Sequence, residues 1–202
     1  MDSKILSKQR SEMRNIRVEF LLEEPSMENF LRIILPNILP EDICLDVNCF
    51  LRPHNGKSDL MKSIPNKVQV FSNFHIPSKI VIVHDQDTSD CIALKAQIKG
   101  LVNINNACDV LIRIPCRELE AWYLGDMDSI KPVYSRFKPE NHKNKAKFRN
   151  PDNLMASDEM KKLCPEFQKG YASKNIPKYM NININKSTSF NHFIVGLNNF
   201  LN

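Results

Sequence analysis

The chain has 202 residues, a formal net charge of +5, 42% hydrophobic residues and 25% charged residues. These values are typical of one globular domain with a sizeable core, and they exclude wholesale disorder. No apolar run approaches the roughly 20 residues of a membrane-spanning helix, and residues 1–4 do not resemble a signal segment. We therefore expect a cytoplasmic protein without membrane contact. The six cysteines form neither a Cys-x-x-Cys pair nor a zinc-finger spacing, which argues against structural zinc and a disulfide framework.

The first 126 residues alternate between strand and helix patterns. Residues 14–22 predict a strand that ends at Glu23 and Glu24, and residues 26–35 carry apolar side chains at helical spacing. The patterns continue with a strand at 43–51, a helix at 58–72 interrupted at Pro65, a strand at 80–83, a helix at 89–100 and a strand at 110–114. Because parallel strands need helical crossovers, this order predicts an α/β fold with a mostly parallel central sheet flanked by helices.

The last third of the chain has a weaker pattern and a different charge. Residues 138–150 and 168–174 read as polar loops, residues 154–163 as a helix, and residues 190–201 as an amphipathic closing helix. We expect an α/β core over residues 1–130 and, packed on it, a basic extension of helices and loops over residues 131–202.

The charge is divided between these two parts. Residues 1–130 have a net charge of −3 and residues 131–202 a net charge of +8. The acidic N-terminal part and the basic C-terminal part predict a metal-type site beside a surface that attracts a polyanion such as DNA or RNA. The alternative is a basic surface that only keeps the protein soluble.

Three predicted strands are followed by carboxylates, which are Glu23 and Glu24, then Asp85 and Asp87, then Glu118 and Glu120. The carboxyl ends of parallel strands share one edge of a sheet, so we expect these side chains to lie together. Mg²⁺ is bound by one or two carboxylates plus water and phosphate, and the edge therefore predicts a Mg²⁺ (or Mn²⁺) site. The alternative is an ordinary turn that caps the next helix. On a helix, Glu118 and Glu120 diverge by about 200°, so only one of them should face the site.

Four basic residues are candidates for nucleic-acid phosphate contacts: Lys57, Arg117, Lys169 and Lys174. Each can equally be a solvated surface charge. The run Gly56-Lys57-Ser58 is not a P-loop, because the position five residues before Gly56 is Leu51 rather than glycine.

Three segments resemble, in the same order, the motifs of the Toprim (topoisomerase–primase) domain. They are Leu22-Glu23-Glu24-Pro25, Val83-His84-Asp85-Gln86-Asp87 and Arg117-Glu118-Leu119-Glu120-Ala121-Trp122. The last segment is similar to one in Toprim nucleases of the overcoming-lysogenization-defect group. The resemblance implies that Glu23 is a general acid/base and metal ligand, that Asp85 and Asp87 are catalytic metal ligands, and that Glu120, before Glu118, is a further metal ligand. Glu24 replaces the usual glycine of the first motif, so the choice between Glu23 and Glu24 stays open.

The whole chain also resembles a small uncharacterised bacterial family that shares these segments and a late Asn185-Lys186-Ser187-Thr188-Ser189-Phe190 run. Its members are often encoded beside ABC/SMC-type ATPases. This resemblance implies a Mg²⁺-dependent endonuclease that acts on DNA or RNA in anti-phage defence, with an ABC/SMC-type ATPase as partner. The oligomeric state, with a homodimer as one option, stays open.

Two alternatives stay open. The first is a non-catalytic binding or regulatory subunit of the ATPase complex, with an apolar patch around Trp122, Tyr123 and Phe190 as its docking surface. The second is a phosphatase that uses Asp85 as nucleophile, which the absence of accompanying Ser/Thr and Lys motifs disfavours.

Overall fold

The computed structural model describes residues 14–102 and 108–202. Residues 1–13 and 103–107 of the predicted α/β core therefore lie outside the described residues. Four strands form one sheet in the order β2-β1-β3-β4, and every neighbouring pair is parallel. Their bounds are β1 (Arg17–Leu22), β2 (Cys49–Pro53), β3 (Ser78–Val83) and β4 (Asp109–Arg113). The predicted α/β fold with a parallel central sheet is confirmed, and it is consistent with a Toprim-like architecture.

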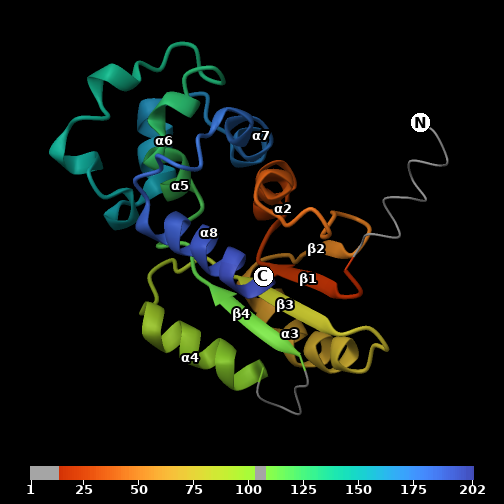
Figure 1. Cartoon of the computed structure of the whole chain (residues 1–202). Helices are drawn as coiled ribbons and strands as arrows, with labels where there is room; N and C mark the ends of the chain where they lie inside the picture. Colours follow the sequence, from red (N-terminus) through yellow and green to blue (C-terminus); the bar gives the residue numbers. More distant parts are fainter. Residues whose placement is uncertain (1–13, 103–107) are drawn as a thin grey trace, which may run out of the picture.

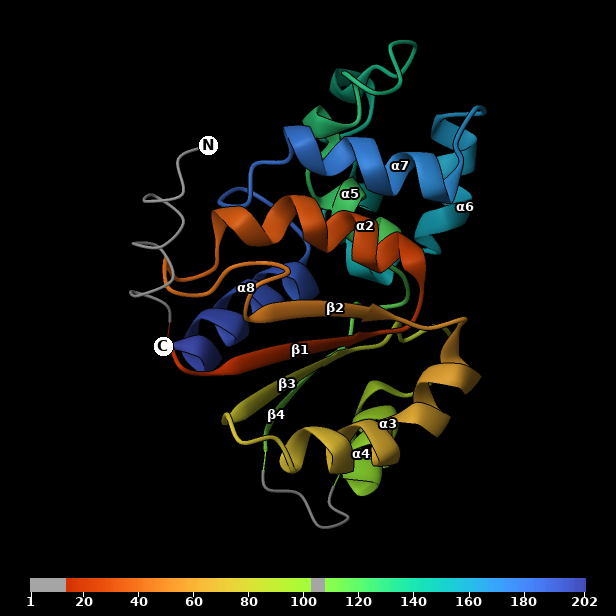
Figure 2. The same ribbon diagram turned by 90° about the vertical axis from the view of Figure 1, so that its right-hand side faces the viewer.

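Helices cover both faces of this sheet, as Figures 1 and 2 show. The helices α2 (Pro25–Ile34) and α8 (Thr188–Leu201) lie on one face, and α3 (Lys57–Ser72) and α4 (Cys91–Val102) lie on the other. Alternate residues of β3 face the two layers, since Val81 and Val83 join the core of α2 and α8 while Ile80 and Ile82 join that of α3 and α4. Burial on both faces explains why this strand is an unbroken apolar run.

Three short helices build a further layer outside α2. They are α5 (Glu120–Gly125), α6 (Ala156–Leu163) and α7 (Lys169–Asn175), linked by short 3-10 turns (Figure 2). Buried residues of this layer and of α8 belong to the same apolar core as β1 and α2. The core is therefore continuous across residues 130 and 131. No helix in the described ranges is long and apolar enough to cross a membrane.

Two sequence predictions about regular structure near the sheet are wrong. The predicted strand at 43–51 begins only at Cys49, because Asp46 has a φ of 60° and the Asn48 side chain accepts a hydrogen bond from the Cys44 N–H. This turn precedes the strand. Pro65 does not interrupt α3, since the helix buries Leu60 before the proline and Val68 after it. Packing of this face outweighs the lost backbone hydrogen bond.

The predicted polar loop at 168–174 is also wrong, because Lys169–Asn175 forms helix α7. Its Ala172 and Ser173 are buried, and the Asn29 side chain of α2 donates a hydrogen bond to Ser173 Oγ at 3.2 Å. Tertiary packing on α2 thus stabilises a helix of only seven residues, a length that is not stable in isolation.

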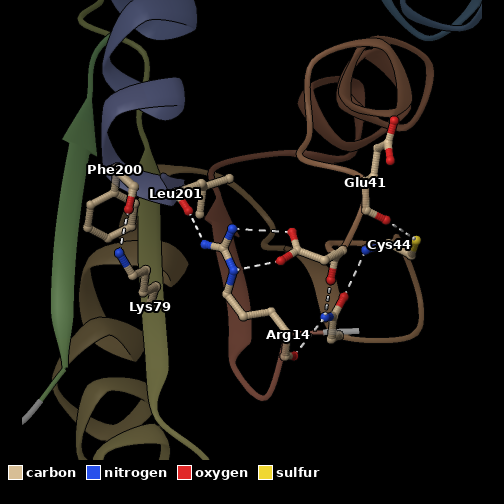
Figure 3. Close-up of polar contacts among 8 residues, drawn as sticks. Arg14, Glu41, Cys44, Lys79, Phe200 and Leu201 are labelled. Carbon is tan, nitrogen blue, oxygen red and sulfur yellow. Dashed lines mark hydrogen bonds and ion pairs between the residues drawn. The ribbon is translucent and has the colours of Figure 1, made fainter. Parts of the chain in front are cut away.

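The last helix is held to the sheet at its C-terminal end, as Figure 3 shows. The Arg14 guanidinium donates to the Leu201 carbonyl and pairs with Asp42, and Lys79 Nζ donates to the Phe200 carbonyl at 2.5 Å. Cations are favourable beside the free carbonyls at a helix C-terminus. These contacts fix α8 across the sheet, with its N-terminal end at the edge where the carboxylates lie.

Candidate functional site

The direction in which successive strands are added to the sheet changes between β1 and β3. The chain runs outward from β1 to β2, then returns past β1 to β3 and β4. Open parallel sheets bind ligands at such a switch point, outside the carboxyl ends of the strands. Glu23 follows β1 there and accepts a hydrogen bond from the Asp85 N–H, which follows β3, at 2.9 Å. The first two acidic turns therefore meet at the switch point.

Asp85 and Glu120 are buried carboxylates beside this turn. Asp85 Oδ1 and both carboxylate oxygens of Glu120 have no hydrogen-bond partner among the described residues. Burial raises the pKa of Asp85 well above its usual range, and the negative charges of Glu120 and Glu23 raise it further. Burial also raises the pKa of Glu120 to about 7, although Lys169 opposes the shift. Unpartnered buried carboxylates are costly, so the cluster favours a proton or a cation.

Glu24 and Lys169 form an ion pair at the same place. Glu24 precedes α2, and its Oε1 accepts hydrogen bonds from Ser26 Oγ at 2.6 Å and from Lys169 Nζ at 2.7 Å. Burial disfavours the charged Lys169, but the charges of Glu120 and Glu24 outweigh this effect and raise its pKa. The Lys169 ammonium thus contacts Glu24 and lies close enough to Glu120 and Asp85 to feel their charge.

The cluster can be tested for its fit to a metal ion. Across residues 14–102 and 108–202, no three His, Cys, Asp or Glu side chains are grouped closely enough to hold one. Mg²⁺ needs fewer, because it keeps several waters and binds one or two carboxylates. The unpartnered oxygens of Asp85 and Glu120 fit that requirement, with Glu23 beside them. Asp85 and Glu120 would hold the ion together with water, and Glu23 would lie beside it.

Asp87 lies at the exposed rim of the cluster. Burial raises the pKa of Glu23, His84 opposes the shift, and the charge of Asp87 adds to it, so Asp87 is close enough to act on Glu23. Asp87 has a φ of 52° and its N–H donates to the Arg117 carbonyl, while Arg117 has a φ of 62°. Such backbone conformations are uncommon outside glycine and often occur at functional sites.

The remaining candidates are more dispersed. Lys57 begins α3, and its Nζ donates to Ser89 Oγ at 3.2 Å, next to the Asp87 turn. Lys174 is exposed on α7. Glu118 accepts a hydrogen bond from the Ser157 N–H at 2.7 Å, whereas Glu120 enters the carboxylate cluster. The structure thus brings together Glu23, Glu24, Asp85, Glu120 and Lys169, with Asp87, Lys57 and Arg117 around them.

Two functional candidates were absent from the sequence analysis. The buried His84 ring places Nδ1 2.6 Å from the Asp85 carbonyl and 3.0 Å from Glu23 Oε2. Tyr123 is buried with an unpartnered hydroxyl among the described residues, and burial together with the charges of Glu120 and Asp85 raises its pKa. The only sequence signal for His84 was its position between a buried strand and Asp85.

The predicted apolar surface patch is wrong. Trp122, Tyr123 and Phe190 are fully buried, and Phe30 contacts all three rings. These aromatic residues belong to the core that supports the cluster, so they offer no docking surface.

The Asn185–Phe190 run contacts α5, the helix that begins with Glu120. Asn185 Nδ2 donates to the Trp122 carbonyl at 2.9 Å, and Ser189 Oγ accepts from the Trp122 ring nitrogen at 2.9 Å. Ser187 Oγ accepts from the Phe190 N–H and so caps α8. The run therefore joins the start of α8 to α5, whose first residue is Glu120.

The comparisons with known proteins identify a family. A family model described as a domain of unknown function, DUF4276, matches residues 22–198, and the chain belongs to this family. The matched range includes every residue of the carboxylate cluster. No curated protein and no solved structure matches the chain significantly.

Proposed function

We propose that this protein is a Mg²⁺- or Mn²⁺-dependent endonuclease with a Toprim-like site that hydrolyses phosphodiester bonds of DNA or RNA. The observation that carries the proposal is the pair of buried, unpartnered carboxylates, Asp85 and Glu120, beside Glu23 at the switch point of the sheet. Their crowded negative charge favours a divalent cation. The order of the three acidic strand ends supports the relation to Toprim domains.

The residues then have separate roles. Asp85 and Glu120 would hold the ion, with Asp87 at the open rim. A bound Mg²⁺ would lower the pKa of a water and stabilise the charge that develops on the phosphate. Glu23 would take a proton from that water, since burial moves its pKa upward, towards the range of a general base. The water oxygen bonds to phosphorus, the bond to the leaving sugar oxygen breaks, and that oxygen takes up a proton.

The biological setting follows from the family resemblance. An endonuclease with an ABC/SMC-type ATPase partner fits an effector in anti-phage defence. The net charge of +8 over residues 131–202 supports binding to nucleic acid. Lys57 and Arg117 lie around the cluster and would contact the phosphate backbone there.

The test is a cleavage assay on plasmid, single-stranded DNA and tRNA with Mg²⁺ or Mn²⁺. Asp85→Asn and Glu120→Gln keep shape but remove charge, and each should reduce cleavage about a hundredfold or more, because both the ion and its water are lost. Asp128→Asn, in an exposed ion pair with Lys143, is the matched control and should cleave like wild type. Undiminished cleavage by Asp85→Asn would refute the metal-site proposal.

One observation favours a second candidate, a non-catalytic subunit of the ATPase complex. Lys169 already places a cation among Glu24, Glu120 and Asp85, as in a purely structural cluster. In that case wild type and Asp85→Asn would both co-purify with the ATPase, and neither would cleave in its presence.

A further inference from the structure

A pocket of about 490 Å³ lies beside the carboxylate cluster, at the edge of the sheet formed by β4. Its walls come from the start of α4, the end of β4 and the turn after it, the 3-10 turn at residues 150–153, and the start of α8. This volume lies in the range of small-molecule sites. None of the predicted metal ligands lines it.

The pocket is cationic. Lys95, Arg113 and Arg117 line it, and Asp152 is the one acidic residue among the described residues of its wall. The oxygens of Asp152 are already used, because Oδ1 accepts from Ser187 Oγ at 2.6 Å and Oδ2 accepts from the Ser189 N–H at 2.7 Å. Among the described residues, no carboxylate forms an ion pair with Lys95, Arg113 or Arg117.

Arg113 is the residue that most clearly indicates an anion-binding site. Its Nε is buried without a partner, and no carboxylate of the described residues forms an ion pair with it. Within the described ranges, its Nη1 donates only to the carbonyl of the neighbouring Ile112, at 3.1 Å. A partly buried guanidinium without a counter-ion is costly, whereas a bound anion would compensate it.

Gly196 of α8 makes room for this guanidinium. A Cβ at this position would overlap Arg113 Nη2, Cζ and Nε, so any other residue would displace the side chain. The arginine is thus accommodated between β4 and α8 by a specific small residue, which indicates a built site.

The pocket shares a wall with the acidic turn. Gln86, which lies between Asp85 and Asp87, lines the pocket and accepts a hydrogen bond from the Arg117 N–H at 3.1 Å. Its own N–H donates to the Pro115 carbonyl at 3.1 Å. Gln86 thus joins the wall of the pocket to the acidic turn through the backbone of Arg117.

We propose that this pocket binds the phosphate group of a nucleotide, held by Arg113, Arg117 and Lys95. Phosphate is the anion that arginine pairs with in two parallel hydrogen bonds. The volume exceeds that of a phosphate ion, and Asn150, Asn153 and Thr188 in the wall offer hydrogen bonds to a sugar and base. The nucleotide is either a free mononucleotide or one unit of a strand. The proposal needs neither a metal ion nor cleavage, so it goes beyond the endonuclease activity.

The test is calorimetric binding in EDTA, with AMP, adenosine, orthophosphate and a 5′-phosphorylated single-stranded oligonucleotide as probes. AMP should bind at least tenfold more tightly than adenosine, because the phosphate carries the recognition. Arg113→Gln should weaken AMP binding at least tenfold, and Lys95→Gln severalfold. Lys99→Gln, one turn further along α4 and outside the pocket, is the matched control and should bind like wild type.

The oligonucleotide separates the two sources of the phosphate. Tighter binding of the oligonucleotide than of AMP, with the same loss in Arg113→Gln, assigns the pocket to a strand. Binding of AMP without the oligonucleotide assigns it to a free nucleotide. Binding of neither probe to the wild type, or equal binding by Arg113→Gln, would overturn the proposal.

A thiol in the pocket gives a local readout. Cys91 and Cys116 line it, and burial raises the pKa of Cys116, so Cys91 is the better reporter. AMP should slow alkylation of Cys91 by iodoacetamide and leave Cys44, outside the pocket, unchanged. Equal rates with and without AMP would contradict occupation of this pocket. If Arg113→Gln fails to fold, Lys95→Glu at an exposed position supplies the same comparison.

Asp85→Asn separates this proposal from the endonuclease. The variant should keep AMP binding even where it loses cleavage. A wild type that binds AMP but cuts no substrate refutes only the nuclease, and one that cuts but does not bind AMP refutes only the pocket.

Discussion

The carboxylate cluster and the cationic pocket meet at one turn, Asp85 to Asp87, and they gather ionisable side chains of opposite sign. Among the described residues, Asp85 Oδ1 and both Glu120 carboxylate oxygens have no hydrogen-bond partner, and Arg113 has no carboxylate counter-ion. Each arrangement is costly in isolation and favourable with a ligand of the opposite charge. The difference teaches that one sheet edge can present a group of acidic side chains and a group of basic side chains together, an arrangement that the proposed metal-dependent nuclease would use.

The regional charge of the chain does not locate these sites. Lys95, Arg113 and Arg117 of the cationic pocket belong to the acidic residues 1–130, and Lys169 of the carboxylate cluster belongs to the basic residues 131–202. Local charge is decided by which side chains the fold brings together, so the net charge of a segment is a weak guide to its ligand.

The sharpest separation of the two regions is a pair of single variants. Glu120→Gln should lower Mg²⁺-dependent cleavage about a hundredfold or more and leave AMP binding within twofold. Arg113→Gln should weaken AMP binding at least tenfold and lower cleavage by a smaller factor. Cleavage rates and calorimetric Kd values on the same preparations check this, and equal losses of both properties in both variants would show that the two regions are one site.

The acidic region should respond to pH when metal is removed. The pKa of Glu120 is raised to about 7 in the folded protein, above its unfolded value of about 4.5, so the folded state binds the proton more tightly. Its contribution to stability is present below about pH 4.5 and is lost as the pH rises through about 7. The free energy of unfolding in EDTA should therefore fall by about 2 kcal/mol between pH 5 and pH 8.

Urea unfolding at both pH values measures this change, and Glu120→Gln is its control. The variant should show a smaller difference, and added Mg²⁺ should offset the loss at pH 8. A wild-type stability that does not fall in EDTA would contradict the crowding of charge at Glu120.

Lys169 should stabilise the acidic region in the absence of metal. Lys169→Met removes the cation beside Glu24 and Glu120, and we expect a loss of about 1–2 kcal/mol. This is less than for a fully buried pair, because the Lys169 side chain is 40% exposed. Thermal unfolding with and without Mg²⁺ checks it, and Mg²⁺ should raise the Tm of the variant more than that of wild type. Lys174→Met on the same helix is the control for stability.

The smallest expected effect concerns the support that both regions share. Ser187→Ala removes the cap of α8 and a hydrogen bond to Asp152, and should cost about 1 kcal/mol. Because α8 borders the pocket and contacts α5, both AMP binding and cleavage should weaken slightly. Thr188→Ala, at the exposed neighbouring position, should leave stability unchanged. A loss of only one property would show that the two regions are supported independently.

Local sequence patterns were sufficient for the sheet and for the acidic strand ends. The alternation of apolar runs and helical spacing predicted four parallel strands, since burial of each element against the next imposes that periodicity. Parallel strands end at a common edge, so the sequence placed Glu23 and the Asp85 turn at the same edge, whereas their direct contact depends on β1 and β3 being neighbours in the sheet.

Tertiary structure alone decided how the charges are arranged. Lys169 reaches Glu24 from a helix that the sequence indicated as a loop, Gly196 makes room for Arg113 across 83 positions of sequence, and Asn185 braces the helix of Glu120. These contacts join residues far apart in the chain and leave no periodic pattern. Their physical basis is the packing of α7 and α8 onto the sheet, which sets burial and charge partners together.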